Sequence, residues 1–182
     1  GQHIGAPAKP VVKKGDKVKV GTMIAEAGGF VSAPIHSSVS GTVFKVDNAV
    51  DASGYMRPAI IINVEGDEWE ESIDRSDKLE RLEDHPELTP EEIVNRVKAA
   101  GVVELCPPPG TTPECVIING VECEPYITSD FRLMMEKADE LIEGVKILMA
   151  AVKVHKGYIG IEDNKPEAIE LLTKKLENNS EI

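Results

Sequence analysis

The stretch CVIINGVECEPYITSDFR, residues 115–132, carries the clearest structural signal in the chain. It opens with a short run rich in β-branched side chains, which is typical of a strand buried in a parallel sheet. Acidic and polar residues follow this run, and a helical pattern begins near Ser129. The stretch therefore predicts a strand whose carboxyl end opens into a polar loop, followed by a helix.

The residues after this stretch alternate between helical and strand patterns. Apolar side chains at helical spacing cover 129–153, with a break expected near Lys137. Residues 158–161 predict a second strand, and Pro166 opens a further amphipathic helix. This order predicts a parallel α/β unit. Because the pattern stops before a sheet of ordinary width is complete, we expect a longer α/β domain in the parent protein.

A helix start precedes the stretch at TPEE, residues 89–92. Thr89 can accept a hydrogen bond from the third helical residue, Pro90 suits the first position, and Glu92 can reach back. Gly101 is the expected end of this helix. The preceding residues 67–88 are acidic and lack periodicity, so they predict a connector that holds a short helical turn.

The first 66 residues have an all-β pattern in which glycine and proline separate short apolar runs. Strands this short cannot each bury a large sheet face, so a compact barrel or sandwich is favoured. Two segments carry the pattern, VKKGDKVKVG at 12–21 and IHSSVSGTV at 35–43. In this order they resemble the two halves of the barrel-sandwich hybrid, or lipoyl-like, fold.

That resemblance raises the question of a swinging-arm carrier, which presents a lysine between the two halves. Residues 26–42 contain no lysine, so lipoate or biotin would have no amine to attach to. A structural or docking module is therefore favoured, and a carrier is the minor alternative. His36 is interpreted as a hydrogen-bonded turn residue, with a ligand or proton donor as the alternative.

Composition narrows the classes of partner. Lys and Arg total 20 and Asp and Glu total 32, for a net charge of -12, and aromatic residues make up 4%. Neither value suits a protein that neutralises phosphates or stacks on bases. No apolar run approaches the roughly 18–20 residues that span a bilayer. Three cysteines without a CxxC pair fit a reducing compartment, and the start at Gly1 leads us to expect that the natural start is missing.

The polar loop after the first α/β strand is the candidate site, because ligands of open α/β sheets bind beyond the carboxyl ends of strands. Asn119 offers a donor and an acceptor, as the edge of a flavin ring needs, and Gly120 lets backbone approach a flat ligand. Glu122 and Glu124 are two residues apart, and we expect them to serve different partners. An ordinary solvated loop with a helix cap at Ser129 is the alternative.

The motif N-G-x-E-C-E-P-Y-x-T-S-D-x-R at 119–132 resembles the signature of RnfC, a family of subunits of Rnf electron transport complexes. That family is related to the flavin-binding NADH dehydrogenase subunit of respiratory complex I. Segments 1–8, 32–41 and 159–169 resemble the same family. The resemblance implies an α/β plus all-β fold, with a barrel-sandwich hybrid at 1–66, an acidic connector at 67–88 and part of a parallel flavin- and nicotinamide-binding α/β domain at 89–182.

The resemblance also implies a function. Electrons would pass between NAD(H) and iron–sulfur carriers through FMN, in a peripheral subunit on the cytoplasmic face of an ion-translocating membrane complex. The partners would be NADH and the other subunits, with no nucleic acid and no direct membrane span. A non-catalytic docking module of a membrane redox complex is the alternative.

The residues that match the family motif receive roles by the same resemblance. Asn119 and Glu122 would line the flavin with Gly120, Glu124 would lie nearer the dinucleotide, and Glu162 would lie near the site. No catalytic residue and no metal ligand is assigned. Cys123 is expected to be a packed thiol.

Three departures from the family pattern matter. A glycine-rich loop of the type G-x-G-G-A-x-F-P is missing between Val103 and Glu104, and its omission from the sequence is favoured over its deletion from the molecule. A Cα–Cα distance of about 3.8 Å between these residues would contradict omission. The cysteine motifs for 4Fe-4S clusters are absent, so the clusters would belong to the parent alone. The later part of the nucleotide-binding domain is also missing, so the fragment is expected to be inactive although its parent would be an NADH-linked oxidoreductase subunit.

Overall fold

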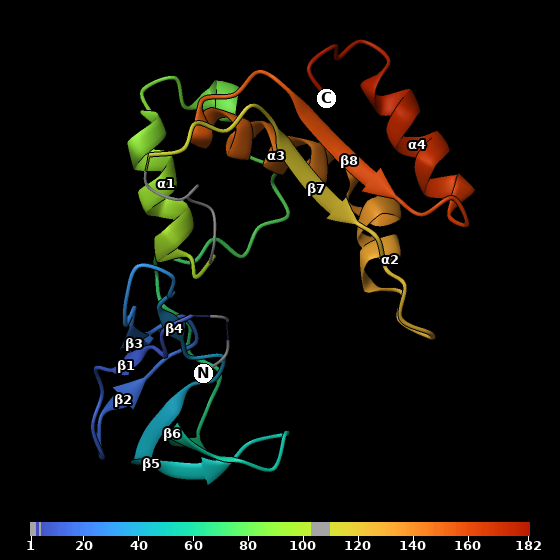
Figure 1. Ribbon diagram of the computed structural model, residues 1–182. Helices are drawn as coiled ribbons and strands as arrows, with labels where there is room; N and C mark the ends of the chain where they lie inside the picture. The colour runs from blue at the N-terminus through green and yellow to red at the C-terminus, as the bar shows by residue number, and fades with distance from the viewer. Residues whose placement is uncertain (1–2, 4, 103–109) are drawn as a thin grey trace. The chain divides into compact units, whose positions relative to one another are not determined.

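The computed structural model describes residue 3, residues 5–102 and residues 110–182 (Figure 1). The expected loop position between Val103 and Glu104 lies outside the described residues. The chain divides into two compact units. The first comprises Gly1–Asp77 and Asn95–Leu105, and the second comprises Lys78–Val94 and Cys106–Ile182.

Two three-stranded antiparallel sheets build the first unit, which confirms the barrel-sandwich fold. Gly15 has a φ of +93° and donates its N–H to the Val43 carbonyl at 2.8 Å, so the first of the two sequence segments turns against the second. His36 pairs with Met23 and is half-buried. One sheet contains β1 (Lys9–Pro10), β3 (Met23–Glu26) and β4 (Ile35–His36), and the other contains β2 (Lys17–Val18), β5 (Gly41–Val50) and β6 (Met56–Val64).

The core of this unit is small, as its short strands predict. Val18, Ile24 and Val43 are buried together, and partly buried aliphatic side chains of β4 and β6 pack around them. Gly41 lies where β5 approaches β6, and a Cβ there would collide with the Asn63 carbonyl. The glycine of the second sequence segment therefore permits the close pairing of this hairpin.

The second unit begins with a short 3₁₀ turn, Leu82–Asp84, and helix α1, Pro90–Ala99, which crosses the boundary between the units. The predicted capping box is present. The Thr89 N–H donates to Glu92 Oε2 at 2.8 Å, and the Glu92 N–H donates to Thr89 Oγ1 at 3.3 Å. Local side-chain chemistry therefore starts this helix as expected.

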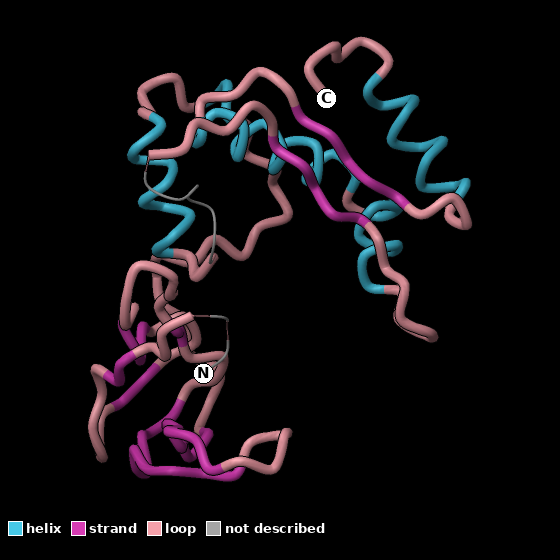
Figure 2. Tube along the Cα trace, in the orientation of Figure 1, coloured by secondary structure: helices cyan, strands magenta, loops and turns pink. Residues whose placement is uncertain are grey.

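A parallel pair of strands forms the centre of the second unit (Figure 2). Strand β7, Val116–Gly120, and strand β8, Gly157–Ile161, run side by side with Asn119 opposite Gly160. In the sequence, β7 and β8 are connected by helices α2, Ser129–Glu136, and α3, Ala138–Val152, which are separated at Lys137 as predicted. Helix α4, Pro166–Leu176, follows β8.

Helix α3 covers one face of this sheet. Val145 and Met149 of α3 pack against Val116, Ile118 and Ile159. A second cluster joins α2, α3 and α4 through Met134, Ile142 and Leu172. Because the strands are parallel, the loops after β7 and β8 leave from the same edge of the sheet, and this brings their polar residues together.

Candidate functional site

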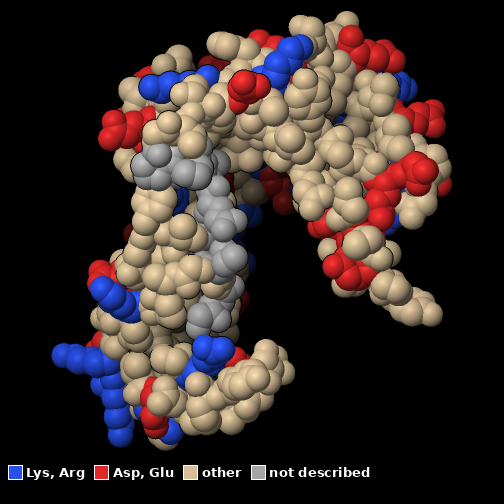
Figure 3. Space-filling model, viewed as in Figure 1, with Lys and Arg blue, Asp and Glu red and all other residues tan. Residues whose placement is uncertain are grey.

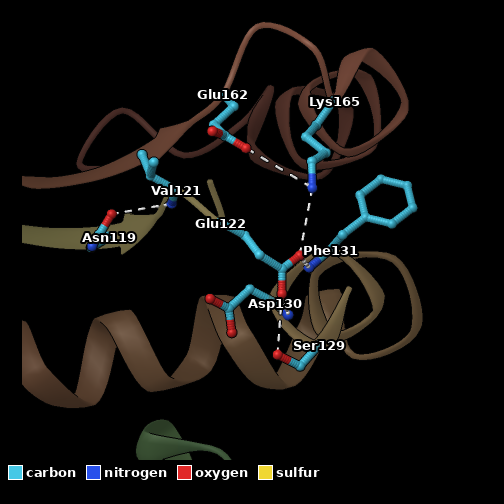
Figure 4. Close-up of polar contacts among 8 residues, drawn as sticks. All are labelled: Asn119, Val121, Glu122, Ser129, Asp130, Phe131, Glu162 and Lys165. Atoms are coloured by element: carbon cyan, nitrogen blue, oxygen red, sulfur yellow. Dashed lines mark hydrogen bonds and ion pairs between the residues drawn. The ribbon is translucent and has the colours of Figure 1, made fainter. Parts of the chain in front are cut away.

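The candidate site lies at the carboxyl edge of the two parallel strands, where the loop after β7 meets the loop after β8 (Figure 4). Asn119 lies near the end of β7 and Glu122 in the loop that follows it, and the loop after β8 supplies Glu162 and Lys165. Figure 3 shows acidic side chains on the surface of the second unit. Glu124, in the loop after β7, is exposed. The edge therefore combines buried and exposed carboxylates.

Glu122 is buried, with 5% of its surface exposed, and it caps helix α2. Its Oε1 accepts hydrogen bonds from the Asp130 N–H at 2.8 Å and the Ser129 hydroxyl at 3.1 Å. Its Oε2 accepts from the Phe131 N–H at 3.2 Å. Thr128, at the N-cap position, makes no capping bond with its side chain. A carboxylate from the preceding loop thus satisfies the free N–H groups at the start of α2.

The charge state of Glu122 follows from these contacts. Burial raises the pKa of Glu122. The hydrogen bonds from Asp130, Phe131 and Ser129, together with the nearby Lys165 ammonium, lower it by more than burial raises it. The net effect places the pKa of Glu122 below its ordinary value. The carboxylate is therefore ionised at neutral pH although it is inside the protein.

Lys165 lies between two carboxylates (Figure 4). Its Nζ is 3.5 Å from Glu122 Oε2 and 4.0 Å from Glu162 Oε2, and it lies 5.3 Å from the centre of the Phe131 ring. Within the described part of the chain, Glu162 Oε2 is buried and has no hydrogen-bond partner. Two carboxylates and one ammonium group leave this cluster with excess negative charge and an unused acceptor.

The other expected site residues have different surroundings. Asn119 is exposed, and its Oδ1 accepts from the Val121 N–H at 3.1 Å. Gly120 is buried, and a Cβ there would lie 2.9 Å from the Gly160 carbonyl oxygen, so its close backbone approach is to the protein itself. Glu124 is exposed, whereas Glu122 is buried. Cys123 is exposed, so the expectation of a packed thiol is wrong.

Comparison with known protein families covers both units. Residues 1–67 match the RnfC barrel sandwich hybrid domain, and residues 97–182 match the Nuo51 FMN-binding domain. The chain belongs to the RnfC family. Its order of domains, barrel first and α/β unit second, is the one that the motif at 119–132 predicts.

Curated relatives agree with the assignment to RnfC. The chain is 42% identical, over 97% of its length and 40% of the relative, to the C subunit of the proton-translocating ferredoxin:NAD(+) oxidoreductase complex of Clostridium ljungdahlii. It is 42% identical, over 99% of its length and 42% of the relative, to the C subunit of the Na(+)-translocating complex of Acetobacterium woodii. It is 43% identical, over 95% of its length and 35% of the relative, to the C subunit of the ion-translocating oxidoreductase complex of Rhodobacter capsulatus. The chain thus spans about two fifths of the length of these RnfC relatives.

Two structural findings concern membrane-spanning helices and metal sites. Among the described residues, none of the helices is both long enough and apolar enough to cross a membrane. In the same residues, no group of three or more His, Cys, Asp or Glu side chains is placed to hold a metal ion.

Sequence reasoning missed one residue of this RnfC site and one backbone feature of the loop after β7. The sequence pattern groups Lys165 with the start of α4, yet a lysine at the N-cap of a helix opposes the helix dipole, and this conflict signals another role. Tyr126 is fully exposed and has a φ of +67°, in the left-handed region that a residue with a side chain rarely adopts. The family motif contains Tyr126, but no local pattern predicts its left-handed conformation, because backbone conformation at one loop residue depends on the whole loop.

Proposed function

We propose that this chain is the barrel and the first part of the flavin domain of an RnfC-type subunit, which passes electrons between NAD(H) and iron–sulfur carriers through FMN. The observation that carries this proposal is the match of residues 97–182 to an FMN-binding domain, combined with the polar edge of β7 and β8. The relatives are subunits of ferredoxin:NAD(+) oxidoreductase complexes, which supports the same activity for the parent.

The residues at this edge suit a flavin. A buried carboxylate oxygen without a donor is costly, and Glu162 Oε2 is such an atom within the described part of the chain. A ligand that brings an N–H or hydroxyl group would remove that cost, and FMN has both. In the described residues, the Asn119 side-chain amide nitrogen has no hydrogen-bond partner and can donate to a flavin carbonyl. We infer that Asn119 and Glu162 contact the cofactor.

The remaining candidates act at other distances from the flavin. Both carboxylate oxygens of Glu122 already accept bonds from α2, so Glu122 would support the site rather than offer an open acceptor. Gly120 would hold β7 close to β8 beneath the site. Glu124 is exposed and would stay available to the dinucleotide. Bound FMN would supply the conversion between two-electron and one-electron transfer.

The glycine-rich loop expected between 103 and 104 remains part of this proposal. The alignments with the relatives run over 190 to 194 positions, whereas the chain has 182 residues, so the relatives contain residues that this chain lacks. We propose that the loop accounts for some of them and that its backbone amides complete the FMN site. The 4Fe-4S clusters would lie in the part of the parent beyond the matched two fifths.

FMN titration of the intact subunit tests this proposal. We expect saturable binding and a higher melting temperature, because a ligand at 100 times its Kd stabilises a protein by about 2.7 kcal/mol. Asn119→Ala should weaken binding, whereas the matched variant Asn178→Ala, at an exposed position after α4, should not. An intact subunit that shows neither binding nor a melting shift at millimolar FMN would contradict the flavin function.

The first unit suits a different task. Because residues 26–42 contain no acceptor lysine, we propose that the barrel docks onto other subunits of the complex and carries no lipoate or biotin. The relatives are named as subunits of translocating complexes, which supports assembly with other subunits, and we propose a peripheral position on the cytoplasmic face. Copurification of the other subunits with the isolated barrel segment would test this role, and an intact mass that shows a cofactor adduct would contradict it.

A further inference from the structure

We propose that Lys165 is a positioning residue that holds the loop after β7 against the loop after β8, and so sets the spacing between Glu162 and the carboxyl end of β7, where Asn119 lies. This inference rests on the proposed function, because the value of that spacing lies in the cofactor that the two residues would share. Lys165 itself would not touch the flavin. Its role would be to connect two loops that are far apart in the sequence.

The location of Lys165 is unfavourable unless its charge is compensated. It occupies the N-cap of α4, where a positive charge meets the positive end of the helix dipole, and its side chain makes no capping bond. Only 18% of the side chain is exposed, so water contributes little compensation. Glu122 and Glu162, at 3.5 Å and 4.0 Å, provide the opposite charge, and the Phe131 ring adds a cation–π contact.

These contacts join three segments at one ammonium group. Glu122 belongs to the loop after β7, Phe131 to the first turn of α2, and Glu162 to the loop after β8. Asn119 precedes Glu122 by three residues, and Glu162 precedes Lys165 by three residues. The two proposed cofactor contacts are thus each a few residues from the same bridge. Loss of the bridge should let both loops move.

The charges explain why a neutral side chain cannot replace Lys165. Without the ammonium group, two carboxylates would face each other inside the protein with no cation between them. They would repel, and one of them would be driven outward or protonated. Glu122 would also lose the ammonium group beside its Oε2, and its hold on the Asp130 and Phe131 amides at the start of α2 would weaken.

The test compares Lys165→Met and Lys165→Arg with wild type in the intact subunit. We expect Lys165→Met to bind FMN about tenfold more weakly, since small displacements of positioning groups have effects of this size or larger. Lys165→Arg keeps the charge and should recover most of the affinity. Lys174→Met, at an exposed position of the same helix, is the matched control and should bind as wild type does.

Amide hydrogen exchange at Asp130 and Phe131 gives a second readout that needs no FMN. Lys165→Met should exchange faster at these two amides, and Lys165→Arg should not. Unchanged FMN affinity in Lys165→Met, measured well below its melting temperature, would overturn the positioning role. If the wild-type subunit fails to bind FMN, the proposed function is wrong. Independently of FMN, unchanged exchange at Asp130 and Phe131 in Lys165→Met would show that Lys165 does not hold the two loops together. Should Lys165→Met not fold, Lys165→Gln takes its place with the same two readouts.

Discussion

Glu122 carries a charge inside the protein because each of its oxygens meets donors. Three donors come from the start of α2 and a fourth contact from Lys165, which together outweigh the cost of burial. The same geometry removes Glu122 from the set of residues with open acceptors. We therefore propose that Glu122 orients the loop after β7, and the expectation that it lines the flavin stays a prediction.

The lowered pKa of Glu122 makes its contribution to stability depend on pH. The contribution is fully present above the ordinary value of a glutamate, about 4.3, and is lost as pH falls through the lower value in the folded protein. We expect Glu122→Gln to melt below wild type at pH 7, and the difference should shrink as pH falls below about 4. Melting curves between pH 7 and pH 3 measure this. Glu124→Gln, at an exposed neighbour, should match wild type throughout, and a Glu122 difference that stays constant with pH would contradict the assignment.

Two glycines in the second unit have opposite effects on its stability. Gly120 ends β7 between the Gly160 carbonyl and Met134 of α2, and any side chain there would push these groups apart. Gly144 lies in α3 with nothing within 4 Å of the position a Cβ would take. Gly120 is therefore required by packing, whereas Gly144 only weakens its helix.

We expect Gly120→Ala and Gly144→Ala to change stability in opposite directions. Gly120→Ala should cost about 1–3 kcal/mol, because its Cβ would lie 2.9 Å from a backbone oxygen and 3.3 Å from Met134 Sδ. Gly144→Ala should stabilise the protein by about 1 kcal/mol, the difference in helix propensity. Urea unfolding of both variants measures these values, and each serves as the control for the other. A stabilising Gly120→Ala would show that the strand end can move apart freely.

Across the whole chain, the acidic connector is divided between the two units at Asp77 and Lys78. Its second part is attached to α3 by Glu143, which is 3% exposed and accepts the Leu82 N–H at 2.6 Å. Arg81 and Lys146 lie 3.6 Å from the other oxygen of the same carboxylate. The predicted short helical turn is thus held by a buried carboxylate of α3, 61 residues away in the sequence.

Limited proteolysis tests this attachment. Glu143→Leu leaves the Leu82 N–H without its acceptor, which costs roughly 1–3 kcal/mol, so the connector should open more often. Trypsin should then cleave after Lys78 and Arg81 about tenfold faster, the effect of 1.4 kcal/mol. Glu140→Leu, at an exposed position of the same helix, should leave cleavage at these sites unchanged. Equal cleavage rates in Glu143→Leu and wild type would show that Glu143 does not hold the connector.

Local sequence patterns by themselves determined the helices and the two parallel strands of the second unit, in their order. The capping box at Thr89 and Glu92 and the break at Lys137 follow from neighbours a few residues apart, and both are present. The family motif pointed to the loop after β7 as the candidate site.

Only the tertiary structure decided which contacts the side chains of that loop make. Lys165 meets Glu122 across 43 positions of sequence, and no periodicity or cap rule encodes such a contact. The parallel register of β7 and β8 places the two loops at one edge, and burial then forces their charges to pair.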